Sequence, residues 1–364
     1  MALFQMELYK LFSQKIIYIV FFVLVLFSTG FTYYHGAAEE REVYQSFEGT
    51  ITEEKLAIAQ KEVEVLNEKL YAEEGIQLTD NEWTLMGVYE SITYGSQIEQ
   101  NKVELIQELD AKNSIAAKHE KSMHEQIDTS YFAYNKGPIE TIDYASFFSI
   151  MITGAMLLIG LATTFTQEHY TGVDNYILSA KKGRKPIVYA KLAAAFVYTV
   201  AVVLGWEIFN LIWNGIQFSH NGWDTAIQYS FKYYFSPFSF TMLEFHLIEL
   251  GFHLLGACAF AFTIVLVSAL CKNSFVSLII SGSIFAVPYF LMEAVDLPKV
   301  LEHMLQFSFL YVMNVEKFFS SYQAIELFGV IVLYAILAVI VMIGVLCVVP
   351  FWINRIVKRK EVVS

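Results

Sequence analysis

Six long apolar segments restrict this chain to few folds. A helix rises about 1.5 Å per residue, so about 20 mostly apolar residues are needed to cross a hydrocarbon core of about 30 Å. Six segments meet this requirement: 16–34, 144–166, 188–213, 246–270, 275–292 and 323–350. The sequence therefore predicts an all-α polytopic membrane protein with about six transmembrane helices, the fifth kinked at Pro288 and the last long enough to tilt.

Charge is concentrated between the first two apolar segments. Residues 35–143 hold 23 Asp and Glu against 9 Lys and Arg, a net charge of −14, whereas the rest of the chain has a net charge of +2. This acidic insert contains none of the three cysteines, Cys258, Cys271 and Cys347, so no disulfide framework is indicated. We interpret the insert as a separate helical domain outside the membrane.

Lys and Arg in the short connections predict the orientation. With both termini in the cytoplasm, the inner segments hold twelve Lys and Arg and the two short outer loops hold three. Cytoplasmic loops of membrane proteins carry this excess of positive charge. We expect N- and C-termini in the cytoplasm, a basic tail at 351–364, and location in a cell membrane.

The N-terminal segment, residues 1–34, combines an expected interfacial helix with the first span. Leu3, Phe4, Leu8, Leu11 and Phe12 can share one helical face, with Gln5, Glu7 and Lys10 off that face. The alternative is a frayed start of the first span. A signal peptide is disfavoured, because the apolar run is long and ends in aromatic residues without a small-residue cleavage pattern.

Helical periodicity within 35–143 predicts a hairpin or small bundle. Capping boxes at Thr50 and Thr79 predict two helix starts, and apolar residues at alternating spacings of three and four from Leu56 to Leu70 predict a packed seam. A second helix should end near Gly95, a third should run from about 97 to 127, and Gly137-Pro138 should break the chain. The insert is either a spacer or a contact surface for a substrate or partner.

Several functional classes lack their sequence signatures. The chain has no GxxxxGK[ST] loop, no HExxH, no GxSxG and no basic-aromatic nucleic-acid surface. ATPase activity of its own and nucleic-acid binding are therefore not expected. Two aromatic outer loops, around Pro237 and after Pro298, are too apolar for solvated loops and too short to span, so they predict re-entrant or interfacial helices.

The loop between the second and third spans carries the most informative pattern. A span ends at Glu168, Gly172 follows at Glu-x-x-x-Gly spacing, and a basic turn leads into a span with a small-residue face at Ala190, Ala193, Ala194 and Ala195. This pattern resembles the permease subunits of type-2 ABC exporters, in which such a loop begins a coupling helix. The resemblance covers most of the chain outside the acidic insert, which the minimal family pattern lacks.

The resemblance implies a coupling loop at 167–187 that grips a separate cytoplasmic ATPase. The residues expected to carry this role are Glu168, Gly172, Tyr176, Lys181, Lys182 and Arg184. It also implies a second permease chain, identical or related, and places ATP and Mg²⁺ in the ATPase subunit, with no cofactor in this chain. The basic residues could instead only anchor the topology and bind anionic lipid.

A second set of polar residues lies in or beside the outer halves of the spans. Its members are Glu207, His246, Glu249, His253 and Glu293. His246, Glu249 and His253 fall on one helical face. Three readings stay open: a polar outer mouth on a substrate path, a metal site, or interfacial side chains that reach headgroups and water.

These patterns together favour a transmembrane permease subunit that couples ATP hydrolysis to export of a lipid-like or peptide substrate. One alternative is a sensor or scaffold whose acidic insert binds a ligand or partner without transport. Another is an intramembrane metalloenzyme built on His246, Glu249 and His253.

Overall fold

The fold is a helical bundle with a helical domain across one end. The computed structural model describes residues 2–33, 37–71, 77–112, 114–173 and 184–359. Six helical stretches in this part of the chain are long and apolar enough to cross a membrane: α2 (Lys15–Thr32), Lys136–Thr171, α11 (Arg184–Phe218), α12 (Met242–Leu270), α13 (Ser274–Ala294) and α17 (Tyr334–Arg359). The prediction of a helical chain with six candidate spans is confirmed by length and composition.

The second of these stretches is continuous across several elements. It comprises α7 (Lys136–Tyr144), a π-helical segment η1 (Ala145–Ser149), α8 (Ile150–Leu161) and α9 (Thr166–Thr171). The expected break at Gly137-Pro138 is wrong, because both residues lie in the first turn of α7, where proline is tolerated since its missing N–H has no helical partner. The expected domain boundary after Asp143 therefore falls inside a continuous helix.

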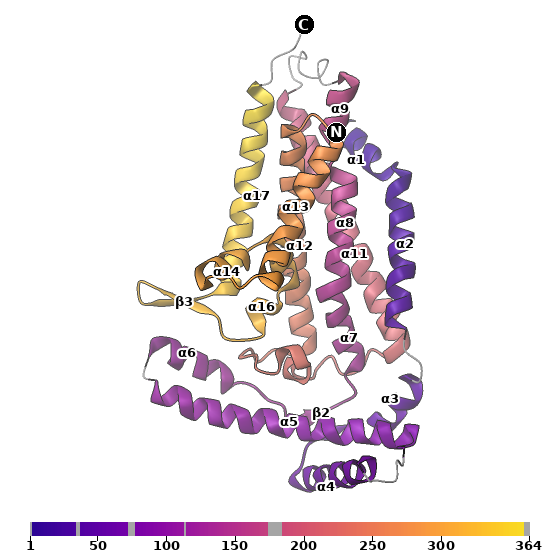
Figure 1. The fold of residues 1–364 in the computed structure, drawn as a ribbon, viewed down its shortest axis with the longest axis vertical. Coiled ribbons are helices and arrows are strands. Elements are labelled where there is room, and N and C mark those ends of the chain that lie inside the picture. The colour runs from indigo at the N-terminus through magenta and orange to yellow at the C-terminus, as the bar shows by residue number, and fades with distance from the viewer. Residues whose placement is uncertain (1, 34–36, 72–76, 113, 174–183, 360–364) are drawn as a thin grey trace.

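Three helices form the centre of the bundle and three lie at its periphery. Of the most apolar 18-residue window, 61–67% is buried in the stretch containing α8 and in α11 and α12, against only 11–22% in α2, α13 and α17. α12 packs against α8, α11, α13 and α17 (Figure 1). The peripheral helices keep large apolar side chains exposed, as expected where lipid or another apolar surface replaces water.

The two ends of the bundle differ in what they carry. The described chain begins beside α9 at the end where α17 also finishes, and we call this the terminal end (Figure 1). The opposite end carries the insert domain, residues 37–132, and we call it the insert end. Helix α1 (Ala2–Phe12) lies at the terminal end and packs against α11, as a separate helix before α2.

The insert domain is built around one long helix. Its elements are α3 (Ala37–Gln45), β1 (Gly49–Thr50), α4 (Glu53–Leu70), α5 (Asp80–Ala111), α6 (Ile115–His124) and β2 (Tyr131–Phe132), with β1 paired antiparallel to β2. The capping box at Thr79 is confirmed, but α4 is capped by Thr52, because Thr50 belongs to β1.

Helix α5 does not end near Gly95 but continues to Ala111, so the predicted bounds of the second and third helices of the insert are wrong. A Cβ at position 95 would lie 2.5 Å from the Tyr229 hydroxyl oxygen, so Gly95 makes room for a side chain of the bundle. The Tyr229 hydroxyl donates a hydrogen bond to the carbonyl of Thr129 (2.9 Å), and the Asn101 amide donates to Tyr234 (2.6 Å). The insert domain is thus joined to the loop around residues 227–234 by side-chain contacts.

The predicted last span contains two different structures. Its first part is an antiparallel pair, β3 (Ala324–Leu327) and β4 (Val330–Leu333), and only then does α17 begin. Phe328 and Gly329 both have positive φ (52° and 81°), the backbone of a two-residue hairpin turn. Periodicity cannot separate a short apolar run that forms a strand from one that forms part of a helix, which explains the error. Residues 351–359 belong to α17, so most of the predicted basic tail is helical.

The connections at the insert end are short helical turns. They are η2 (Ile227–Tyr229), η3 (Phe231–Tyr233), α14 (Lys299–Leu305), α15 (Phe309–Asn314) and α16 (Glu316–Phe319). Helices were expected in both aromatic loops; short α-helices form after Pro298, whereas the loop before Pro237 forms only 3₁₀ turns. α15 packs on α12, so these turns close the insert end of the bundle.

Candidate functional site

The site at the terminal end lies around the turn that joins α8 to α9. Helix α8 ends at Leu161, and α9 starts after a four-residue turn. The backbone N–H of Phe165 donates to the Ser268 hydroxyl of α12 (2.9 Å), and the Thr166 hydroxyl lies 2.7 Å from that of Ser274 on α13. These contacts hold α9 against two other helices and direct Glu168, in its first turn, toward α11 and α1.

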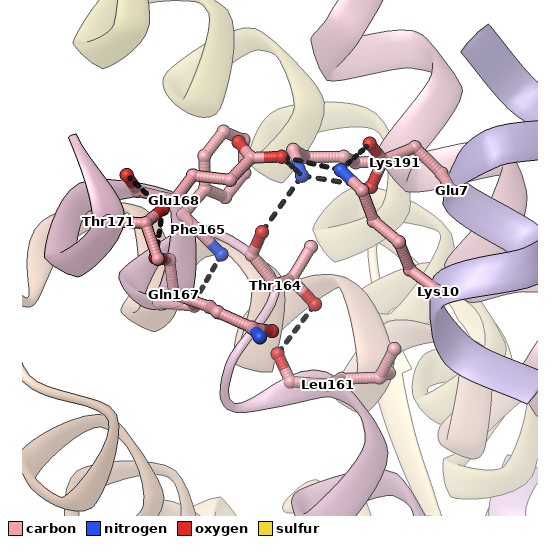
Figure 2. A network of polar contacts seen from close by, with 10 residues as sticks. Glu7, Lys10, Leu161, Thr164, Phe165, Gln167, Glu168, Thr171 and Lys191 are labelled. Carbon is pink, nitrogen blue, oxygen red and sulfur yellow. Dashed lines mark hydrogen bonds and ion pairs between the residues drawn. The ribbon is translucent and has the colours of Figure 1, made fainter. Parts of the chain in front are cut away.

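Four charged side chains from three helices meet at this point. We call Glu7 and Lys10 of α1, Glu168 of α9 and Lys191 of α11 the terminal network (Figure 2). The Lys191 ammonium lies 2.7 Å from Glu168 Oε1 and 2.9 Å from Glu7 Oε2. The Lys10 ammonium lies 2.9 Å from Glu168 Oε1 and 2.7 Å from Glu7 Oε1. Each carboxylate therefore bridges both lysines.

The terminal network is buried and balanced in charge. The Lys191 side chain is 1% exposed, and its ammonium also donates to the Thr164 carbonyl (2.8 Å) and lies 5.1 Å from the centre of the Phe165 ring. Two carboxylates face two ammonium groups, so no net charge is left in a region of low dielectric constant. Loss of the buried Lys191 would leave two carboxylates with one half-exposed partner.

Lys10 is the exposed member of the terminal network. Its side chain is 48% exposed. Partial burial lowers its pKa, but hydrogen bonds from its ammonium to Glu7 and Glu168 and their negative charges outweigh that effect, so the net change is a raised pKa. Lys10 thus stays charged at neutral pH and can face a cavity of about 350 Å³, which is lined by α1, residues 163–173 and the start of α11.

The predicted coupling residues fall partly within the described chain. Glu168 is buried in the terminal network, where it forms an ion pair with Lys191. Gly172 ends α9 with φ +70°, a left-handed cap that favours glycine. Tyr176, Lys181 and Lys182 lie outside the described residues. Arg184 begins α11, and its side chain lies outside the described part as well.

A second group of polar side chains meets inside the bundle near the insert end. We call Glu207 of α11 with His246 and Glu249 of α12 the acid–histidine cluster. His246 Nε2 lies 2.8 Å from Glu207 Oε1, and His246 Nδ1 lies 3.2 Å from Glu249 Oε2. One turn further along α12, His253 Nε2 lies 3.1 Å from the Thr153 hydroxyl of α8. The structure thus brings Glu207, from a separate predicted span, into contact with the helical face that carries His246 and Glu249.

The interfacial reading of these residues is wrong for four of the five. Glu207, His246, Glu249 and His253 are at most 6% exposed, so they do not reach headgroups or open water. Glu293 lies apart from them: it is exposed in the last turn of α13 and accepts a hydrogen bond from the Tyr311 hydroxyl (3.3 Å). Among the described residues, no group of three or more His, Cys, Asp or Glu has the arrangement of a metal site.

Sequence reasoning missed three of the four members of the terminal network. Lys191 entered only the charge count, and Glu7 and Lys10 were placed off the apolar face of the first helix. The available signal was Lys191, a cation among Val188, Ala190 and Leu192 that are all buried. A charge so placed requires a carboxylate partner, but the sequence alone does not say which one.

Comparison with protein-family models, with curated proteins and with solved structures finds no match for this chain.

Proposed function

We propose that this chain is the membrane-spanning permease subunit of an ATP-driven exporter of the type-2 ABC kind, located in a bacterial cell membrane. A separate cytoplasmic ATPase would bind ATP and Mg²⁺ and act on the coupling loop, residues 167–187. A second permease chain would complete the transport path. The substrate class is lipid-like or peptide.

The layout of the two ends supports the proposed orientation. The described start of α1, the start of α11 and the end of α17 share the terminal end, which is also where the excess of Lys and Arg lies. The acidic insert domain lies at the opposite end. With the terminal end in the cytoplasm, the coupling loop faces the compartment that holds ATP, and the insert domain stands outside the cell.

The terminal network is the observation that carries the proposal. An ATPase that pushes on a loop moves the spans only if the loop is joined to them stiffly. Glu168 joins α9 to α11 through Lys191 and to α1 through Lys10, and Phe165 and Thr166 join the same turn to α12 and α13. A displacement of α9 is therefore transmitted to four other helices.

The surface beside the terminal network suits a protein partner. Val173, which is 43% exposed, lines the same cavity as the half-exposed Lys10, and Tyr170 on α9 is 89% exposed. Exposed tyrosine beside apolar and charged side chains is typical of binding hot spots. The largely exposed apolar faces of α2, α13 and α17 are available to lipid and to the second permease chain.

Gly172 supplies a sharp test of coupling. The full chain is tagged and extracted from its native membranes in mild detergent, and the accompanying Walker-motif ATPase is quantified. Gly172→Val forces a β-branched residue into a left-handed conformation, at a cost of roughly 1–2 kcal/mol, and should release most of the ATPase. Gly172→Asn, which tolerates this conformation, should retain it.

Both variants should insert into the membrane as the wild type does, since a Cβ at position 172 meets no atom within 4 Å. Wild-type ATPase binding by Gly172→Val would contradict the coupling role. Recovery of the wild-type chain without any Walker-motif ATPase would contradict the proposal as a whole.

Recovery of the wild-type chain without an ATPase would favour the sensor or scaffold alternative. One observation supports that alternative on its own: the insert domain contacts the bundle through Tyr229, Asn101 and the His119–Tyr322 pair (3.1 Å), so ligand binding to it could be passed to the spans.

A further inference from the structure

The acid–histidine cluster contains more negative charge than its own positive charge can balance. Both nitrogens of the His246 ring face carboxylate oxygens, one from Glu207 and one from Glu249. An imidazolium supplies one positive charge against two carboxylates, which leaves a net charge of −1. Within the described chain, the ion pairs of these three side chains are only with one another.

Burial makes that remaining charge costly. Glu249 is 1% exposed, and its second carboxylate oxygen, Oε1, is buried without a hydrogen-bond partner. An ionised carboxylate in such a place loses its hydration and gains in return only the 3.2 Å contact of its other oxygen with His246, which Glu207 also shares, whereas the neutral acid costs much less. Two protons on the cluster, one on His246 and one on Glu249, bring its charge to zero.

The surroundings of the cluster do not supply another cation. Lys232 of η3 is the nearest lysine to act on Glu249, but it is paired with Asp143 (2.8 Å) and donates to Ser146 (3.0 Å). The other titratable side chains around Glu249 and Glu207 are Tyr233, Tyr144, His253 and, beyond Tyr233, Glu316, and none of them is a lysine or an arginine. The Tyr233 hydroxyl is itself buried without a hydrogen-bond partner.

Polar side chains continue on both sides of the cluster. On α11, Asn210 and Asn214 follow Glu207 at spacings of three and four, so the three share one helical face. The Asn214 amide donates to Asn210 (2.7 Å), which donates to the Thr141 carbonyl (3.0 Å). On the other side lies the pair of His253 with Thr153. This buried polar face runs from near the insert end of α11 to α8.

We propose that the acid–histidine cluster is a proton-binding site and that Glu249 carries its exchangeable proton. The proton is retained while α11 and α12 pack as in this structure. Separation of the two helices would part His246 from Glu207 and admit water, which lets Glu249 ionise. Proton release is therefore coupled to relative movement of α11 and α12, whether or not an ATPase drives that movement.

Infrared spectroscopy of the purified full chain tests the proposal. At neutral pH, the wild-type protein should show the C=O stretching band of a buried neutral carboxylic acid, and the band should shift in D₂O. Glu249→Gln should lose this band. Glu244→Gln is the matched control, because Glu244 is an exposed acid on the same helix whose capping role glutamine can also fill.

A second measurement guards against misfolding of the variant. Glutamine has the shape of the neutral acid, so Glu249→Gln should remain folded, and its thermal midpoint should fall less than that of the wild type as pH is raised. Persistence of the band in Glu249→Gln would overturn the assignment. A midpoint that rises with Na⁺ in the wild type but not in Glu249→Gln would identify a metal-cation site instead.

Discussion

Lys191 and His246 each face two buried carboxylates, but the two sites differ in charge. At the terminal network, Lys10 adds a second positive charge, and the four groups balance. At the acid–histidine cluster nothing described adds a second cation, so balance requires an additional proton. The difference between a permanent structural joint and a site that exchanges a proton thus depends on one lysine.

The unequal burial of the two lysines leads to a prediction. Lys191→Met leaves Glu7 and Glu168 with one half-exposed partner, and removing one partner of a buried ion pair costs roughly 3–5 kcal/mol. Lys10→Met removes a side chain that is 48% exposed, and the loss should be about 1 kcal/mol or less. Thermal unfolding in detergent measures both, and equal losses would show that burial does not set the cost.

At the scale of elements, the insert domain depends on the packing of α6 beside α5. His124, in the last turn of α6, is 5% exposed. Lys102 of α5 forms an ion pair with Glu99 and donates to the carbonyl of Ile127 (2.8 Å), which places its positive charge near the same imidazole. The contact between these two helices therefore includes a histidine that is disfavoured when charged.

This contact predicts a pH dependence of α6. Burial lowers the pKa of His124, and the charge of Lys102 lowers it further. In the unfolded chain histidine binds a proton near pH 6.5, so the unfolded state binds more protons as the medium is acidified. The stability that His124 contributes is complete above about pH 6.5 and declines as pH falls toward the lowered value in the folded state.

Hydrogen exchange of the α6 amides, corrected for intrinsic rates at each pH, should show declining protection on acidification below that value. His124→Leu should remove most of this decline, whereas replacement of the exposed His220 by Gln should not. An unchanged pH profile in His124→Leu would assign the effect to other groups.

At the scale of the whole molecule, the chain separates two kinds of charge between its two ends. The acidic insert domain is at one end, and the terminal network and most of the Lys and Arg of the short connections are at the other. The apolar peripheral helices between them match a bilayer that keeps the ends apart.

Cysteine accessibility tests this separation. With Cys271 and Cys347 replaced by Ser, Lys118→Cys in α6 should react with a membrane-impermeant thiol reagent added to intact cells. Tyr170→Cys, at an 89% exposed position of α9, should react only after permeabilisation. Labelling of Tyr170→Cys in intact cells would put the coupling loop outside and remove the basis of the proposed function.

The accuracy of the sequence analysis varied with the range of the interactions involved. Spans and the Thr79 cap depend on neighbouring residues, and their positions agree with the structure within a few residues, apart from the final span and the longer second stretch. Errors arose where contacts between distant residues were not visible in the local pattern: Gly95 lies within α5, where Tyr229 packs against it, and residues 324–327 and 330–333 pair as strands.

Length, apolar content and charge distribution were enough to predict a helical chain with six candidate spans and an acidic insert, because the capacity to cross a hydrocarbon layer is decided by residues close in sequence. The partners of buried charges were decided only by tertiary structure. Glu7 and Lys191 are 184 residues apart, and Glu207 and His246 lie on different helices. A charge buried in low dielectric must find a partner, but only the packing of the helices decides which one.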